Sequence, residues 1–270
     1  TESTNISSTS SISHISCNGD SDGAIDLTVS GGTLPYLFSW SNGQLSEDIN
    51  TLSAGTYSVM ITDGTGCIEF LNNITIQEPS ALVANGSISS NYNGQDISCF
   101  GLNDGQITAN VSGGTSPYTY SINNGSTLLT STFNTLNAGS YNLTYYDDNS
   151  CTVSETITLS EPPLLQSSIL SSNDISCWGY GDGSIDISIL GGVQNSSSPL
   201  YNVNWISTNG YTSGSTNLSN ITQAGTYTAT ITDANGCQGP TISEYISEPT
   251  ALNALTTPQE VSCYGYSDGG

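Results

Sequence analysis

Residues 16–30 read SCNGDSDGAIDLTVS and contain the pattern that decides the fold. The stretch opens with Ser16-Cys17, continues as Cys-x-Gly-x-x-Asp-Gly to Gly23, and then alternates apolar and polar residues up to Val29. Gly and Asp are turn residues, and period-two alternation is typical of a strand with one buried face. The stretch therefore predicts a turn that leads into a half-buried β-strand.

This pattern recurs along the whole chain. Ser-Cys stands at 16–17, 98–99, 176–177 and 262–263, so successive copies are 82, 78 and 86 residues apart. In the first three copies a Gly-Gly pair, a Pro-Tyr or Pro-Leu-Tyr element, Ala-Gly-Thr/Ser-Tyr, a second cysteine and Glu-Pro follow in the same order. Such self-similarity indicates tandem repeats. We predict repeats at 1–79, 80–162 and 163–249, with the start of a fourth, truncated repeat at 250–270, and expect a longer array.

The predicted fold class is all-β, a tandem array of immunoglobulin-like sandwich repeats of about 84 residues each. Thr, Val, Ile and Tyr are frequent in the alternating runs, Gly, Asn and Asp punctuate them, and no segment has a helical period. In the second copy we expect strands at 81–90, 105–111, 118–122, 126–136 (one strand or two), 140–147 and 152–159. The tyrosines that recur in register are expected in or beside the core.

The charge balance excludes several classes of function. The 270 residues include no Lys or Arg, one His and 23 acidic residues, for a formal net charge of −23. A chain without cationic side chains cannot neutralise nucleic-acid phosphates or dock on an anionic membrane, and it has no apolar run that spans a membrane. A Ser-His-Asp triad needs a histidine, and His14 is the only one. We therefore expect no enzyme, no nucleic-acid partner and no membrane insertion.

Seven cysteines fall at two positions per repeat, which predicts disulfides and an oxidising, extracellular location. Pairing within repeats is favoured, because it leaves only Cys263, in the truncated copy, without a partner. The alternative is pairing between neighbouring repeats, for example Cys17–Cys151. It applies if the middle segment of each repeat forms two strands, which would put the two cysteines at opposite ends of the domain. The favoured pairs are Cys17–Cys67, Cys99–Cys151 and Cys177–Cys237.

Two sets of repeated aspartates are candidate Ca²⁺ ligands at the ends of the domains. An Asp in a Gly-rich turn also binds its own backbone amides, and no copy has the dense Asp-x-Asp-x-Asp-Gly ligand run. We therefore favour turn formation and keep Ca²⁺ as the one cofactor candidate. The aspartates are Asp22, Asp63, Asp104, Asp147, Asp182 and Asp233.

An aromatic residue follows the first cysteine in three copies, as Phe100, Trp178 and Tyr264; the first copy has Asn18 there. A position inside a Gly-rich turn favours exposure over core packing. These three residues are therefore the candidates for ligand contact.

Taken together, Ser-Cys-x-Gly-x-x-Asp-Gly, Gly-Gly, Pro-Tyr, Ala-Gly-Thr-Tyr, Thr-Asp-x-x-Gly-Cys and Glu-Pro resemble the SprB repeat family. The second copy departs at 146–151, YDDNSC, but keeps its cysteine. The family occurs in very long surface proteins of Bacteroidetes, among them a gliding-motility adhesin. The resemblance implies type IX secretion, attachment to the outer membrane through other parts, and a filament that grips polysaccharide or a solid surface. It carries over no catalytic or binding residue.

Two functions follow as expectations. The first is an adhesin filament whose repeats serve as shaft and as weak multivalent contacts, with polysaccharide and other repeats of the same chain as partners. The second is a spacer without a ligand of its own, stiffened by Ca²⁺ in one version, that projects a distal domain.

Overall fold

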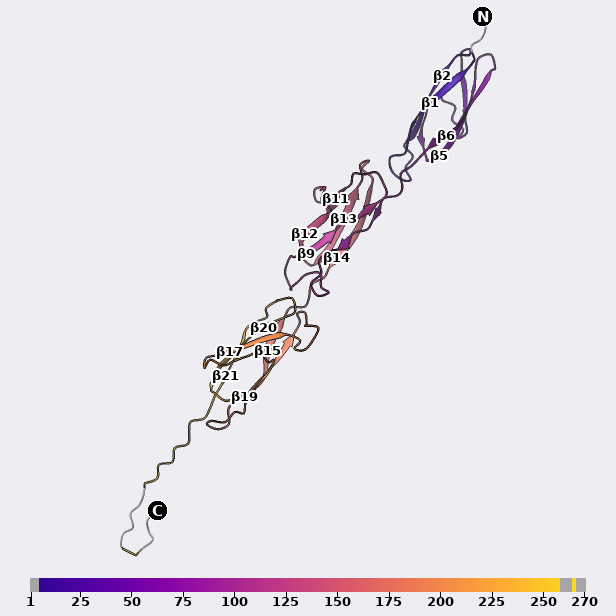
Figure 1. Cartoon of the computed structure of the whole chain (residues 1–270). Coiled ribbons are helices and arrows are strands. Elements are labelled where there is room, and N and C mark those ends of the chain that lie inside the picture. The colour runs from indigo at the N-terminus through magenta and orange to yellow at the C-terminus, as the bar shows by residue number, and fades with distance from the viewer. Residues whose placement is uncertain (1–4, 258–263, 266–270) are drawn as a thin grey trace. The chain divides into compact units, whose positions relative to one another are not determined.

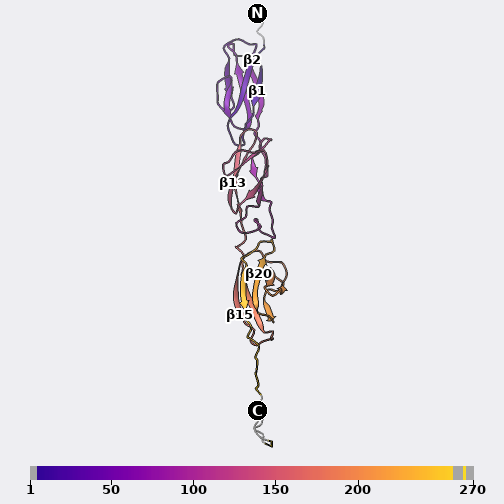
Figure 2. The same cartoon turned by 90° about the vertical axis from the view of Figure 1, so that its left-hand side faces the viewer.

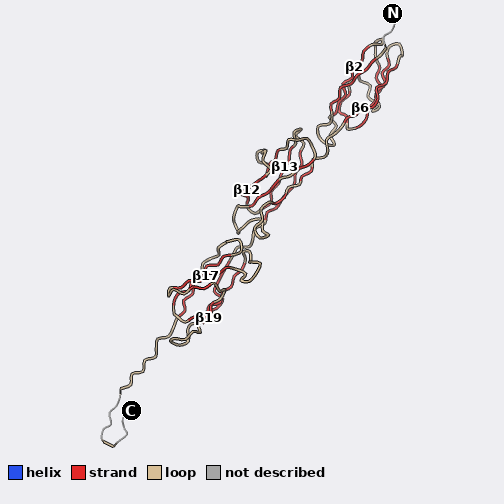
Figure 3. The backbone as a smooth tube through the Cα atoms, viewed as in Figure 1, coloured by secondary structure: helices blue, strands red, loops and turns tan. Residues whose placement is uncertain are grey.

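The computed structural model describes residues 5–257 and 264–265. These residues form strands, turns and loops without any helix, as Figure 1 and, from a second side, Figure 2 show. Figure 3 marks the strands in red. The chain divides into two compact units, Thr1–Ser90 with Asn103–Leu159, and Asn91–Leu102 with Ser160–Gly270. The described part of the chain holds no helix of the length and apolar composition needed to cross a membrane.

The first unit begins with a sandwich of two three-stranded antiparallel sheets. One sheet has the order β1-β2-β4, from β1 (Ser7–Ser13), β2 (Gly23–Ser30) and β4 (Ile49–Leu52). The other has the order β3-β5-β6, from β3 (Leu37–Trp40), β5 (Gly55–Thr62) and β6 (Ile68–Ile76). The inward residues of both sheets, Trp40 among them, form one hydrophobic core. This is the half-buried strand pattern that residues 16–30 predict.

The first unit continues with the strands of the second copy. A short pair joins β7 (Val83–Ala84) to β10 (Val111–Ser112). One sheet holds β8 (Ser87–Ile88), β9 (Gly105–Thr108) and β12 (Thr132–Leu136) in the order β12-β9-β8. The other holds β11 (Thr119–Ile122), β13 (Gly139–Tyr146) and β14 (Thr152–Leu159) in that order.

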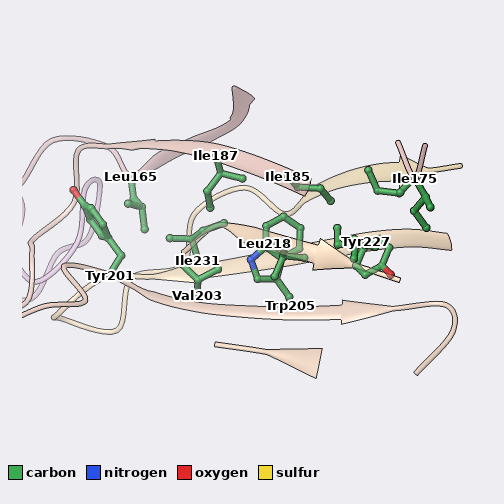
Figure 4. Packing of buried hydrophobic residues seen from close by; sticks show 13 residues of the cluster. Leu165, Ile175, Ile185, Ile187, Tyr201, Val203, Trp205, Leu218, Tyr227 and Ile231 are labelled. Atoms are coloured by element: carbon green, nitrogen blue, oxygen red, sulfur yellow. The ribbon is translucent and has the colours of Figure 1, made fainter. Parts of the chain in front are cut away.

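The second unit contains the sandwich of the third copy. One sheet has the order β15-β16-β19, from β15 (Gln166–Asn173), β16 (Gly183–Leu190) and β19 (Leu218–Ile221). The other has the order β18-β17-β20-β21, from β17 (Asn202–Ser207), β18 (Thr212–Ser213), β20 (Gly225–Thr232) and β21 (Ile242–Ile246). Figure 4 shows Trp205 between the sheets beside Val203 and Leu218. The predicted immunoglobulin-like all-β fold is confirmed, while the exact repeat boundaries stay predictions.

Tyrosine hydroxyls fix the same two turns in every copy. Tyr57, Tyr141 and Tyr227 each donate to the carbonyl four residues upstream, at 2.9, 2.9 and 2.8 Å, which is the tyrosine corner of immunoglobulin-like sandwiches. The Pro-Tyr tyrosines donate to the first Gly of the Gly-Gly turn; for Tyr118 and Tyr201 the distances are 2.8 and 2.9 Å. All of these side chains are buried or half-buried, as predicted.

Candidate functional site

Both disulfides of the described residues join a cysteine of one copy to a cysteine of the next. Cys17 is bonded to Cys151 and Cys99 to Cys237, with Cα–Cα distances of 5.6 and 5.7 Å. Each bond lies within one compact unit. The favoured intra-repeat pairs Cys17–Cys67, Cys99–Cys151 and Cys177–Cys237 are therefore wrong, and the inter-repeat alternative is correct. Cys67 and Cys177 are exposed free thiols, and Cys263 lies outside the described residues.

The two cysteines of one repeat cannot meet because they lie at opposite ends of its sandwich. At the end that follows Cys17, Gly23 lies against Ile15, Leu52 and Ile76. At the end that precedes Cys67, Gly32 lies against Asp63. Strand β2 separates these two glycines, and its eight residues span about 26 Å. A disulfide tolerates a Cα separation of only about 4.4–6.8 Å, so the bonded cysteines pair with a neighbouring repeat instead.

The first cysteine of each repeat sits in what we call the Ser-Cys loop, residues 16–20, 98–102 and 176–180. A glutamate of the Glu-Pro element binds this loop: the backbone N–H of Gly19, Gly101 and Gly179 donates to Glu78, Glu161 and Glu248 at 2.8, 2.6 and 2.7 Å. The glutamates thus close the first-cysteine end of their own repeats.

The aspartate after the Ser-Cys loop also holds it. Ser16 N–H donates to the Asp22 carboxylate at 3.1 Å, and the Ser16 hydroxyl donates to its other oxygen. The side-chain hydrogen bond from Ser16 is the main reason why the pKa of Asp22 lies below its usual value. Asp182 accepts from Ser176 N–H at 3.0 Å, and its pKa is lowered in the same way. Asp104 is half-buried just before β9.

The second cysteine sits in what we call the Asp-Cys loop, residues 63–67, 147–151 and 233–237. The leading aspartates are only 4%, 6% and 1% exposed. One oxygen of each carboxylate accepts from the backbone N–H groups two and four residues on, at 2.9–3.0 Å. The other oxygen accepts from the N–H that follows the Gly-Gly turn, at 2.8–3.0 Å. Each carboxylate therefore ties the cysteine loop to the Gly-Gly turn.

The electrostatics of Asp63 reflect this environment. Burial alone would raise its pKa, but hydrogen bonds from the Cys67 N–H, from Thr65 and from the Thr33 N–H outweigh burial and lower the pKa to about 2. The carboxylate is therefore ionised at neutral pH, with both oxygens occupied by donors. The described residues contain no group of three or more His, Cys, Asp or Glu side chains placed to hold a metal, so these aspartates are not gathered into one site.

An asparagine completes each disulfide joint. Asn149 Nδ2 donates to the Ser16 carbonyl at 2.9 Å, and Asn235 Nδ2 donates to the Ser98 carbonyl at 2.8 Å. The sulfur atoms of Cys151 and Cys237 contact the same two carbonyls at 3.4 and 3.2 Å. Sequence reasoning missed this residue, although Asn stands two positions before the second cysteine in both bonded loops. In the first copy Thr65 takes its place.

The candidate aromatic residues differ in their surroundings. Phe100, 51% exposed, lines a cavity of about 250 Å³ together with Cys237, Asp233 and Pro162. The structure thus brings a predicted ligand-contact residue to the edge of a disulfide joint. Trp178 is 62% exposed in the Ser-Cys loop of Cys177, and Tyr264 is fully exposed. These two are not gathered with Phe100 in that cavity.

Comparison with protein families finds a similar family for two segments of the chain. The SprB repeat family matches residues 9–45 and 91–127. The predicted resemblance is confirmed at these two places in the chain. A search among curated proteins finds no match.

Three solved structures show a distant likeness to this chain. Three N-terminal domains of the highly immunogenic outer capsid protein of bacteriophage RB49 align at 14% identity and a TM-score of 0.39, over 90% of this chain and 96% of that one. The N-terminal eight immunoglobulin domains of Down syndrome cell adhesion molecule align at 11% identity and a TM-score of 0.37. The alignment covers 92% of this chain and 46% of that one. Invasin, a bacterial integrin-binding protein, aligns at 14% identity and a TM-score of 0.30, over 90% of this chain and 60% of that one. The chain thus spans about half of the second protein. TM-scores this low establish no function.

The family match and the two disulfides support an extracellular, adhesin-like repeat segment.

Proposed function

We propose that this chain of SprB repeats is part of a cell-surface adhesin filament that serves gliding motility and grips extracellular polysaccharide or a solid surface. The observation that carries the proposal is the covalent connection of successive copies by Cys17–Cys151 and Cys99–Cys237. An adhesin transmits tension between a surface and the cell. A disulfide at each joint keeps neighbouring repeats attached under loads that open non-covalent contacts.

Weak contact through the repeats fits the exposed aromatics of the Ser-Cys loops. An aromatic face stacks on the apolar face of a sugar ring, and Phe100 and Trp178 recur at equivalent positions. Recurrence lets many weak contacts add up to firm attachment. A catalytic role has no comparable support, because the only imidazole, His14, accepts a backbone hydrogen bond from Gln77 at 3.1 Å.

Retention on a polysaccharide column tests the contact. We expect the purified chain to be retarded on agarose and the W178A F100A variant to lose most of the retardation. Y245A is the matched control, because Tyr245 is equally exposed, at 62%, but belongs to strand β21 and not to a Ser-Cys loop. Equal retardation of all three proteins, or of none, would favour a spacer without a ligand.

Antibody labelling on live cells of the source organism tests location and motility. Label that moves along the cell surface supports a motility adhesin exported by type IX secretion and attached to the outer membrane through other parts. Label that stays fixed favours a static adhesin or spacer, and absence of surface label rejects the proposal. A calcium-stiffened shaft stays a separate prediction: chelation would have to lower the melting temperature, and an unchanged melt would eliminate it.

A further inference from the structure

Two exposed cysteines lie in loops whose equivalents in other repeats carry a disulfide. Cys177 occupies the Ser-Cys loop of its repeat, equivalent to Cys17 and Cys99, and Cys67 occupies the Asp-Cys loop, equivalent to Cys151 and Cys237. In both observed disulfides a Ser-Cys loop is bonded to an Asp-Cys loop. The two free thiols are thus one of each kind.

The free Ser-Cys loop already has the geometry of the bonded ones. Ser176 N–H donates to Asp182 at 3.0 Å, as Ser16 N–H donates to Asp22 at 3.1 Å. Gly179 N–H donates to Glu248 at 2.7 Å, within the 2.6–2.8 Å range of the bonded copies. Tyr180 N–H donates to the Cys177 carbonyl at 3.0 Å and closes the backbone turn. The two disulfide-bonded Ser-Cys loops have the same hydrogen bond. The loop therefore needs no rearrangement to bond.

The free Asp-Cys loop is equally preorganised. Cys67 N–H donates to Asp63 at 2.9 Å, the distance found for Cys151 and for Cys237. Thr65 replaces the joint asparagine, and its hydroxyl donates to Asp63 instead of to an incoming loop. Exposed apolar side chains border this loop: Ile68, 54% exposed, follows Cys67, and Leu34, 74% exposed, is next to Thr33, whose carbonyl accepts from Gly64 N–H. An uncovered apolar rim beside a free thiol suits a docked partner.

We propose that Cys67 and Cys177 are docking points for further repeats of the same type, each bonding the complementary loop, so that the disulfides form a continuous staggered series. In the purified chain the partner is a second copy, with Cys177 of one molecule bonded to Cys67 of another. This inference goes beyond the adhesin proposal and does not depend on any polysaccharide contact.

The bond forms by two thiol–disulfide exchanges with an external disulfide as oxidant. One protein thiolate attacks a sulfur of oxidised glutathione, which forms a mixed disulfide and releases one glutathione thiolate. The complementary protein thiolate then attacks the protein sulfur of the mixed disulfide and releases the second glutathione. Two protein thiols are oxidised and one glutathione disulfide is reduced, and the released thiolates take up the two protons.

Complementation between single-cysteine variants tests the pairing. In a C263S background, C67S leaves only Cys177 free and C177S leaves only Cys67 free. We expect each variant alone to remain mainly monomeric in an oxidising glutathione buffer, and an equimolar mixture to form disulfide-linked dimers at least several-fold more. A non-tryptic digest is required, since the chain has no Lys or Arg, and it should yield a Cys67–Cys177 peptide with both native disulfides intact.

Two results would overturn the proposal: single variants that dimerise as readily as the mixture, or a mixture that forms no dimer. Loop geometry supplies a further readout. E248Q in the Cys177 partner removes the charge that binds Gly179 N–H, and we expect slower coupling to Cys67 but an unchanged rate with a small aromatic disulfide. An equal drop in both rates would mean that only thiol reactivity was altered.

Discussion

At the scale of single residues, the aspartate that begins each Asp-Cys loop organises the joint. A carboxylate has enough lone pairs to accept several donors, and Asp63 collects the N–H groups of Thr33, Thr65 and Cys67. In all three copies an Asp lies four residues before the second Cys. This repeated spacing was the sequence signal for the loop. Sequence alone could not tell a turn-forming aspartate from a metal ligand, because the third backbone donor comes from the distant Gly-Gly turn.

The lowered pKa of Asp63 predicts an acid-sensitive loop. The pKa of Asp63 is about 2 in the folded chain against 3.8 for an unperturbed Asp carboxyl, so its contribution to stability is fully present above about pH 4. That contribution is lost as the pH falls through 2. We expect D63N to lower the melting temperature at pH 7 and to flatten the pH dependence between 4 and 2. Thermal melts of both proteins across that range measure this, and parallel curves would contradict it.

Ser121, on strand β11 of the second copy, is a buried polar residue. It is 1% exposed, and its hydroxyl is without a hydrogen-bond partner among the described atoms. A buried unsatisfied hydroxyl costs about 1–3 kcal/mol. We expect S121A to raise the free energy of unfolding by about 1 kcal/mol in urea titrations. S39A, at the equivalent exposed position on β3, is the control and should change little; a destabilising S121A would show that the hydroxyl has a partner.

At the scale of strands, the sequence predicts the sandwich better than it predicts the disulfides. Alternation and turn residues act locally, so the runs that begin at Gly23, Gly105 and Gly183 indicate their strands directly. The cysteine pairing depends instead on how many times the chain crosses the sandwich. Strands β3 and β4 are antiparallel to β5 and β2, respectively, and β2 and β5 end at the same pole.

Residues 41–48 must therefore cross back between β3 and β4 without forming a regular strand. In the third copy only Thr212–Ser213 of that crossing is β-structure. A crossing without alternation leaves no periodic signal in the sequence. The number of strands could therefore not be predicted, and neither could the end of the sandwich at which the second cysteine lies. The role of Asn149 and Asn235 in the joints could not be predicted either, because asparagine is also a common turn residue.

The disulfide joint makes a measurable contribution to stability. Cys17–Cys151 closes a sequence separation of 134 residues, for which chain entropy sets about 5 kcal/mol as the expected gain. Because each copy keeps its own core, we expect C17S C151S to lose less, about 2–4 kcal/mol, in urea unfolding followed by tryptophan fluorescence. C67S removes a thiol outside both disulfides and should stay within about 0.5 kcal/mol of the parent. Equal losses in the two variants would contradict this role.

At the scale of the whole molecule, nearly all charged side chains are negative at neutral pH. The 23 acidic residues face no Lys or Arg, and His14 is the only side chain that can become positive. Such a surface is kept soluble at neutral pH by its negative charge. It also prevents the opposite-charge pairing that draws ordinary proteins together.

This imbalance predicts an unusual response to acid. An ordinary protein precipitates near its isoelectric point and dissolves again below it, because its Lys and Arg side chains then carry a large positive charge. Here protonation of the carboxylates below pH 4 removes nearly all charge, and only His14 and the amino terminus replace it. We expect light scattering to rise between pH 4 and 3 and to stay high down to pH 1.5 at 0.15 M salt. Amidation of surface carboxyls with ethylenediamine adds cationic groups and should restore solubility at low pH; clearing of the unmodified protein below pH 2 would contradict the argument.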